Sequence, residues 1–171
     1  MRLKDLLKRR QPRIEEEFFR RIAAAYPEEA ASILSTEQDP FLNPMSATIR
    51  QGAAVIVHGL LNDLTPDQIA PSIEQIVRIR AVQDFTPSEA VSFVFLLKEI
   101  VSEELQHDGQ DPELSAELNR LASRFDALAL KAFDAYVACK ESIMHIRIKE
   151  AHKERDRLLR LLQALNRNAE H

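Results

Sequence analysis

Residues 78–99 of the chain read RIRAVQDFTPSEAVSFVFLLKE. This stretch contains the end of one amphipathic helix, a Thr-Pro corner and the start of a strongly apolar helix. Thr86 can accept hydrogen bonds from the first-turn N–H groups, and Pro87 has the preset φ that suits a first helical turn. Residues 90–97, AVSFVFLL, contain a single polar side chain. Because a helix that is apolar on all sides favours burial, we predict a central helix from Pro87 to about Gln106.

The polar residues just before this corner have two interpretations. Arg80 and Asp84 are four residues apart on the preceding helix and can form an ion pair on a solvated face. Alternatively, the polar side chains line a pocket or a signalling contact beside the central helix. Periodicity does not choose between these alternatives. The candidate ligand or signalling residues are Arg78, Arg80, Gln83, Asp84 and Thr86.

Longer stretches around the corner resemble a known family. The matching residues are Asn43 and Pro44 at a helix start, IRQG at 49–52, IVRIRAVQDFTPSEAV at 76–91, FVFLLK at 93–98 and FDAYVACKE at 133–141. Together they are similar to the RsbRD-type N-terminal sensor domain family, which is related in role to the RsbR co-antagonists of the bacterial general stress response. The resemblance covers most of residues 1–150.

This resemblance implies a non-enzymatic, all-helical sensory module of the stress response. By analogy with RsbR sensors, we expect a globin-like or related helical bundle. Family members are usually fused to an output domain such as STAS or a histidine kinase, and no such domain follows the last helix of this sequence. We therefore expect either a stand-alone adaptor with a regulatory protein partner or a chain whose output domain is missing.

Composition narrows the function classes. The chain has 171 residues, a net charge of −4 and 45% hydrophobic residues, with no basic cluster of the kind that binds nucleic acid. No stretch has the apolar length of a membrane span, and the N-terminus lacks the apolar core of a secretory signal. The single cysteine excludes an intramolecular disulfide and suits a reducing compartment. We expect a cytoplasmic protein without membrane or nucleic-acid partners.

The pattern of the whole chain predicts an all-α fold, because it has three glycines and almost no strand-like alternation. A short helix is expected over residues 3–9, and a second helix is expected to begin at Pro12. Asn43 and Pro44 predict a helix to about residue 62, in which Gly52 would allow close approach of another helix. Pro71 lies too deep for an unbroken helix, so we expect a kink or a turn at residues 67–70.

A long C-terminal helix is expected from Pro112. Beyond Ile146 the sequence is almost entirely charged before leucines return, so we divide the chain into a helical sensor domain, 1–146, and a charged helical stalk with a short leucine-rich seam, 147–171. A seam this short needs a partner helix, and a second copy of the chain is the obvious one. The first apolar seam comprises Leu114, Leu118, Leu121, Phe125, Leu128, Ala132, Ala135 and Cys139, and the predicted dimer seam comprises Leu158, Leu161, Leu162 and Leu165.

The sequence contains no recognisable catalytic constellation, metal motif or phosphate-binding loop, so we expect neither an enzyme nor a cofactor. His58 could be imagined as a haem ligand, but a core or surface histidine is the favoured interpretation. His145 and His152 could be imagined as phosphorylation sites, but no ATP-binding domain is present. Cys139 could be a redox-sensing thiol beside Lys140, although a buried small side chain is the simpler interpretation.

The sequence therefore favours a sensor or regulatory module that binds a signal or partner and relays it through a dimerising C-terminal helix. The alternative is a structural adaptor that binds no ligand and docks on a partner protein through its helices. A polar-lined cavity near Arg80 would favour the sensor, and a fully packed interior would favour the adaptor.

Overall fold

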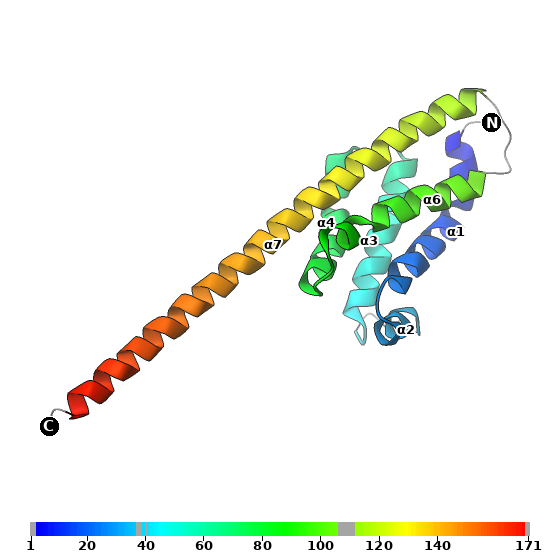
Figure 1. Ribbon diagram of the computed structural model, residues 1–171. Coiled ribbons are helices and arrows are strands. Elements are labelled where there is room, and N and C mark those ends of the chain that lie inside the picture. Colours follow the sequence, from blue (N-terminus) through cyan, green and yellow to red (C-terminus); the bar gives the residue numbers. More distant parts are fainter. Residues whose placement is uncertain (1–2, 37–38, 40, 106–111, 170–171) are drawn as a thin grey trace. The chain divides into compact units, whose positions relative to one another are not determined.

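The computed structural model describes residues 3–36, 39, 41–105 and 112–169, with side chains described from residue 115 to 167 in the last range (Figure 1). These residues form seven helices and no strand, which confirms the predicted all-α fold with a long C-terminal helix. The chain divides into two compact units, Met1–Tyr136 and Val137–His171. The helices are α1 (Leu3–Ala24), α2 (Glu28–Thr36), α3 (Pro44–Leu61), α4 (Pro66–Val82), α5 (Pro87–Val91), α6 (Phe93–Leu105) and α7 (Pro112–Ala169).

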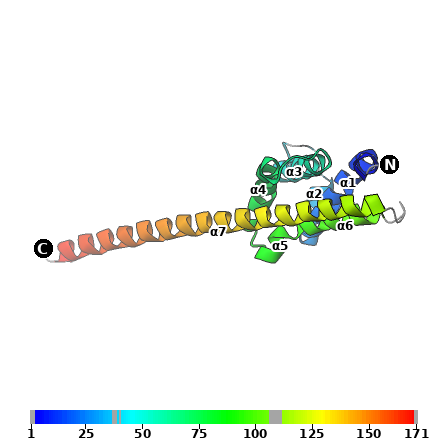
Figure 2. The same cartoon turned by 90° about the horizontal axis from the view of Figure 1, so that it is seen from above.

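The first unit is a bundle in which α1 packs between α3 and α6, and α3 packs between α1 and α4 (Figures 1 and 2). Ion pairs also join the first part of α7 to the bundle, from Asp126 to Lys98 of α6 at 3.6 Å and from Lys131 to Asp67 of α4 at 2.7 Å. Of the first apolar seam, Leu121, Phe125, Leu128 and Ala132 are buried. Within the described residues, no helix has the length and apolarity needed to cross a membrane.

Helix α1 continues through Pro12, so the predicted helix start at that residue is wrong. Proline in a helix interior costs about 3 kcal/mol because it removes one hydrogen bond and crowds the preceding turn. The buried residues Leu3, Leu7, Ile14 and Phe18 nevertheless lie on one face that extends across the proline. Burial of this continuous face outweighs the local cost.

The same correction applies to Pro71, which lies inside the continuous helix α4. The helix begins earlier, at a capping box in which Thr65 and Gln68 exchange side-chain and backbone hydrogen bonds. Ile69 and Ile73 flank the proline on the buried face, while Pro71 itself is exposed. The kink or turn predicted at residues 67–70 is therefore absent, because the cap and the buried face specify one helix.

The predicted central helix is divided at Ser92 into α5 and α6, and it is not buried on all sides. The carbonyl of Glu89 accepts hydrogen bonds from the Ser92 hydroxyl at 2.8 Å and from Arg80 Nη1 at 2.7 Å. These two side-chain donors bind the same carbonyl just before Ser92, where they compete with the backbone N–H that would continue a regular helix. Phe93 is fully buried, but Phe95 is 45% exposed.

Two corners of the bundle are built from the same local sequence pattern, NDLTP at 62–66 and QDFTP at 83–87. In each corner the aspartate has a positive φ, 57° at Asp63 and 60° at Asp84, and the next N–H closes the helix end by bonding to a carbonyl five residues back. A capping box with the threonine as N-cap then starts the next helix. The predicted cap at Thr86 is thus confirmed, and Thr65 repeats it.

The two glycines of α3 provide a matched test of helix packing. A Cβ at Gly59 would lie 2.7 Å from Cγ1 of the buried Ile69, whereas a Cβ at Gly52 would lie 3.2 Å from Ile76. The second distance confirms the close approach predicted at Gly52. Although alanine gains up to about 1 kcal/mol of helix propensity, we expect Gly59→Ala to lower the free energy of unfolding by about 1–2 kcal/mol. Gly52→Ala should change it by less than about 1 kcal/mol in either direction.

Urea denaturation followed by circular dichroism measures both variants at one protein concentration. The double variant Gly59→Ala, Ile69→Ala should lose less than the sum of the two single losses, because the truncated isoleucine no longer meets the added methyl. Simple additivity would contradict the steric explanation.

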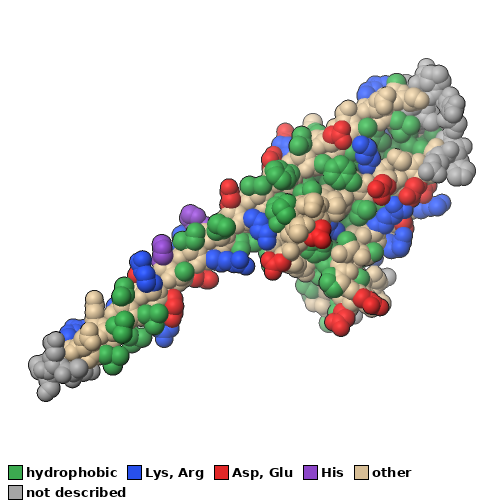
Figure 3. Space-filling model, viewed as in Figure 1, with side chains coloured by type: hydrophobic (Ala, Val, Ile, Leu, Met, Phe, Trp, Pro, Cys, Tyr) green, Lys and Arg blue, Asp and Glu red, His purple; other side chains and the backbone are tan. Residues whose placement is uncertain are grey.

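The second unit consists of the C-terminal part of α7. None of the side chains described from residue 137 to 167 is buried. Figure 3 shows hydrophobic side chains interspersed with charged ones along this helix. The leucines of the predicted dimer seam are all between 52% and 64% exposed, namely Leu158, Leu161, Leu162 and Leu165.

Candidate functional site

Arg80 is the largest fully buried side chain of the described residues. Its Nη1 donates to the carbonyl of Glu89 at 2.7 Å, and its Nη2 donates to the carbonyl of Ile22 at 3.5 Å. Its guanidinium carbon lies 5.1 to 5.7 Å from the centroids of three aromatic rings, which are Tyr26, Phe85 and Phe93. Neither alternative drawn from the sequence, a solvated face or a polar pocket, describes this residue, because it lies inside an aromatic cage.

Burial has opposite effects on the two ionisable groups of this cage. Loss of solvent lowers the pKa of the Arg80 guanidinium and raises the pKa of the Tyr26 phenol. The nearby positive charge of Arg80 opposes the rise in the pKa of Tyr26. Among the described residues, Arg80 Nε and the Tyr26 hydroxyl are buried without a hydrogen-bond partner. Such groups cost free energy, so the cage depends on ring contacts and on the two carbonyl bonds.

The other predicted site residues do not join Arg80 in a pocket. Arg78, Gln83 and Asp84 are exposed, and the Gln83 amide lies 3.2 Å from the sulfur of Met45. The Thr86 hydroxyl contacts the Glu89 carboxylate at 2.7 Å as part of the cap of α5. The predicted set is therefore divided between one core residue, one cap and three surface residues.

Helix α7 is attached to the equivalent carbonyl of each repeated corner. Arg124 Nη2 donates to the carbonyl of Leu64 at 2.6 Å, and the Tyr136 hydroxyl donates to the carbonyl of Phe85 at 2.9 Å. Arg124 also donates to the carbonyls of Leu60 at 2.6 Å and Gly59 at 3.3 Å, which end α3. A single guanidinium thus satisfies the helix end that the bundle leaves open.

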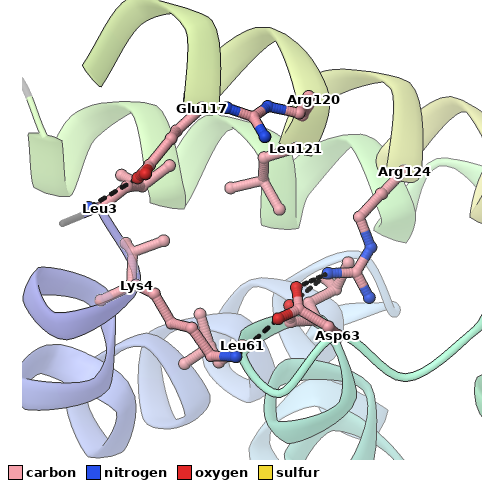
Figure 4. Close-up of a pocket in the computed structure, with 10 residues that line it drawn as sticks. Leu3, Lys4, Leu61, Asp63, Glu117, Arg120, Leu121 and Arg124 are labelled. Carbon is pink, nitrogen blue, oxygen red and sulfur yellow. Dashed lines mark hydrogen bonds and ion pairs between the residues drawn. The ribbon is translucent and has the colours of Figure 1, made fainter. Parts of the chain in front are cut away.

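A cavity of about 310 Å³ lies beside the first corner, where α1, α3 and α7 meet (Figure 4). Its apolar wall consists of leucine side chains from all three helices, and all of them are buried. Charged groups complete the lining. The leucines are Leu3, Leu7, Leu60, Leu61 and Leu121, and the charged residues are Lys4, Asp63, Glu117, Arg120 and Arg124.

Most of the charges around the cavity already have partners. The Asp63 carboxylate accepts from Lys4 Nζ at 2.6 Å and from Arg124 Nη1 at 3.1 Å, and the hydrogen bond from Lys4 lowers the pKa of that carboxyl. The Glu117 carboxylate accepts from the backbone N–H of Leu3 at 2.8 Å. In contrast, the hydrogen bonding of Arg120 within the described residues is limited to a 3.5 Å contact from its Nε to the carbonyl of Ala116 on its own helix. The cavity therefore has apolar walls and, as far as the described residues go, one cation without a carboxylate partner.

The sequence interpretation did not find this cavity, because its residues come from three distant segments, near 3–7, 60–63 and 117–124. The repeated NDLTP and QDFTP pattern was the signal that could have marked Asp63 as part of a second, equivalent corner. No periodicity within one segment predicts which residues of α7 will meet it.

The remaining candidates lie outside both sites. Cys139 is half-buried in the second unit, and His145 and His152 are exposed there. His58 is exposed on α3, with its ring 3.2 Å from the side-chain nitrogen of Asn62. Within the part of the chain that the structure describes, no three histidine, cysteine, aspartate or glutamate side chains are grouped to hold a metal ion.

The architecture defines an all-helical bundle whose last helix, joined to both corners, continues into an exposed amphipathic segment. The model of the family described as the RsbT co-antagonist protein rsbRD N-terminal domain matches residues 12–151. The chain belongs to this family, which comprises regulatory sensor domains and is not a known enzyme family.

Other comparisons are more distant. An uncharacterized protein of Archaeoglobus fulgidus is 23% identical over 101 residues, covering 58% of this chain and 63% of the relative. The chain thus spans less than two thirds of the length of this curated relative. No solved structure matches the chain, and a globin-like arrangement stays a prediction.

Proposed function

We propose that the chain is a non-enzymatic regulatory module of a stress response, in which the helical bundle receives a signal or partner and α7 relays it by pairing with a second copy. Family membership supports the regulatory role. The attachment of α7 to both corners of the bundle gives a physical route, since any change in the corners alters contacts of that helix.

The exposed segment of α7 is the observation that carries this proposal. Its apolar residues recur every seven positions at Val137, Met144, Ala151, Leu158 and Leu165, and all are exposed. Ile148 and Leu162 each follow a member of this series by four residues, which completes a heptad spacing. A lone helix with such a stripe leaves its apolar surface in water, so it favours a partner helix.

Charged residues within this heptad series restrict how two copies could align. The same heptad position is occupied by two exposed charged residues, Glu141 before Ile148 and Arg155 between Ile148 and Leu162. Polar residues at such positions restrict register and oligomer state at a cost in stability. The predicted stalk and seam, with the leucines at 158, 161, 162 and 165, then act as one dimer interface.

The structural adaptor is the second candidate function, and the same exposed stripe supports it if the partner helix belongs to another protein. The cavity at the first corner favours a sensor, although it lies beside Asp63 and not near Arg80 as the sequence interpretation required.

The test is the solution mass of the full chain compared with a chain cut after Glu150, measured by analytical ultracentrifugation. We expect a dimer for the full chain and a monomer for the cut one. Two dimers would place the interface upstream and reject the C-terminal relay. Two monomers would reject self-pairing and favour the adaptor.

A pair of matched variants locates the interface without truncation. Leu158→Ser with Leu162→Ser removes two seam side chains and should convert the dimer to a monomer. Arg160→Ser with Gln163→Ser changes the same turns outside the seam and should leave the dimer intact. Equal masses for both pairs would contradict the heptad assignment.

A further inference from the structure

We propose that the cavity between α1, α3 and α7 binds a small amphipathic monocarboxylate, whose apolar body packs on the leucines and whose carboxylate pairs with Arg120 (Figure 4). Only the assignment of this cavity as the sensory input rests on the proposed function. Binding itself is a separate property of the bundle.

The size and walls of the cavity determine the apolar part of the ligand. At about 310 Å³ it is at the small end of ligand sites, and at roughly 30 Å³ per water-sized group it holds on the order of ten non-hydrogen atoms. Side chains on three helices provide its apolar surface, which favours a flexible hydrocarbon over a polar metabolite. The wall leucines are Leu3, Leu7, Leu60, Leu61 and Leu121.

The charge balance determines the head group. Lys4, Arg120 and Arg124 supply three positive charges, and Asp63 and Glu117 supply two negative ones, which leaves one positive charge. Asp63 pairs with Lys4 and Arg124, whereas Glu117 accepts from the neutral Leu3 N–H. Among the described residues Arg120 makes no ion pair, so it is the cation left to bind an anion. One such cation matches a monoanion better than a doubly charged phosphate, and a guanidinium suits a planar carboxylate.

The position of the cavity relates binding to α7. Leu121 and Arg124 of α7 line it, and Arg124 also holds the end of α3. A bound molecule would therefore contact both sides of the joint between the bundle and this helix. This arrangement allows a ligand to favour one packing of α7 over another.

Octanoate is the probe, because it has ten non-hydrogen atoms and one carboxylate. We expect isothermal titration calorimetry of the full chain to show one site, and methyl NMR to show shifts at Leu60 and Leu121. Octan-1-ol, which keeps the chain length without the charge, should bind at least tenfold more weakly, as expected for loss of a charge-assisted hydrogen bond.

Variants of exposed residues test the role of charge without disturbing the core. Arg120→Ala should weaken octanoate binding at least tenfold, while Arg120→Lys retains most of it. Arg78→Ala, an exposed arginine of α4 outside the cavity, should bind as the unaltered chain does. Arg120→Glu should lose octanoate and bind octylamine.

Three results would overturn this inference. They are the absence of octanoate binding below its micelle concentration, equal binding of octan-1-ol, and unchanged binding by Arg120→Ala. Failure here does not test dimerisation, because the solution masses with and without the seam are measured in the absence of ligand. Conversely, a monomeric full chain that binds octanoate through Arg120 would reject the relay and retain the site.

Discussion

Replacing Arg80 with alanine is expected to lower the free energy of unfolding by about 3 kcal/mol. The substitution removes a large, fully buried side chain and leaves a cavity among three aromatic rings. It also removes donors from the carbonyls of Glu89 and Ile22. Because the variant no longer buries a cation, part of this loss is offset, and the expected loss is smaller than that of the largest core truncations.

Arg80→Met should cost less than about 1 kcal/mol, because it restores most of the volume without the buried charge or the unpaired Nε. The expected order of stability is therefore the unaltered chain and Arg80→Met close together, with Arg80→Ala well below. For a chain of this length, about 3 kcal/mol corresponds to a decrease in Tm of about 6–12 °C.

Urea and thermal denaturation at a fixed protein concentration measure these differences, since an oligomer's stability depends on concentration. Arg78→Ala, two residues away and exposed, is the control and should lie within about 0.5 kcal/mol of the unaltered chain. If Arg80→Met and Arg80→Ala lost equal free energy of unfolding, the hydrogen bonds from Arg80 to the carbonyls would stabilise the cage and the volume of its side chain would not.

Replacing Arg124 with alanine is expected to cost about 2 kcal/mol. This guanidinium donates to the carbonyls of Gly59, Leu60 and Leu64 and contacts the Asp63 carboxylate. Its side chain is 23% exposed, so water can replace only part of these bonds. The variant removes the side-chain donor to the last carbonyls of α3 and one attachment of α7 to the first corner.

Arg124→Lys should recover less than half of the loss, because one ammonium cannot match a planar fork that reaches three carbonyls. Arg120→Ala, one turn earlier on the same helix, is the matched control and should change stability by less than about 0.5 kcal/mol. Hydrogen exchange should report increased opening at residues 59–64 in Arg124→Ala, and protection there equal to that of the unaltered chain would contradict the capping role.

The features that could be predicted from the sequence are local ones. The caps at Asn43 and Thr86 depend on hydrogen bonds that span three residues, so the residue types alone indicate them. The all-α class follows from helical periodicity over the whole chain. The amphipathic C-terminal segment could also be predicted, because its heptad spacing lies within one helix.

The candidate site required contacts that local pattern does not contain. Arg80 lies on the same helical face as Ile73 and Ile76, yet an arginine at such a position normally indicates a boundary with solvent. Its burial depends on the rings of Tyr26 and Phe93, which come from distant parts of the chain, as well as on the nearby Phe85. Likewise, no feature of α7 alone indicates that Arg124 meets the end of α3 while Arg120 has no carboxylate partner in the described part of the chain.

The sequence by itself thus determined where most helices begin, that no strand is needed, and that the last helix carries an unburied apolar stripe. The tertiary structure decided that α1 and α4 continue through Pro12 and Pro71, that Arg80 turns inward, and that a cavity opens at the first corner. The physical reason is the distance along the chain over which each interaction acts. Caps and helical periodicity depend on residues a few positions apart. The free energy gained by burial comes from contacts between distant segments, and it can exceed a local cost of about 3 kcal/mol, such as that of a proline inside a helix.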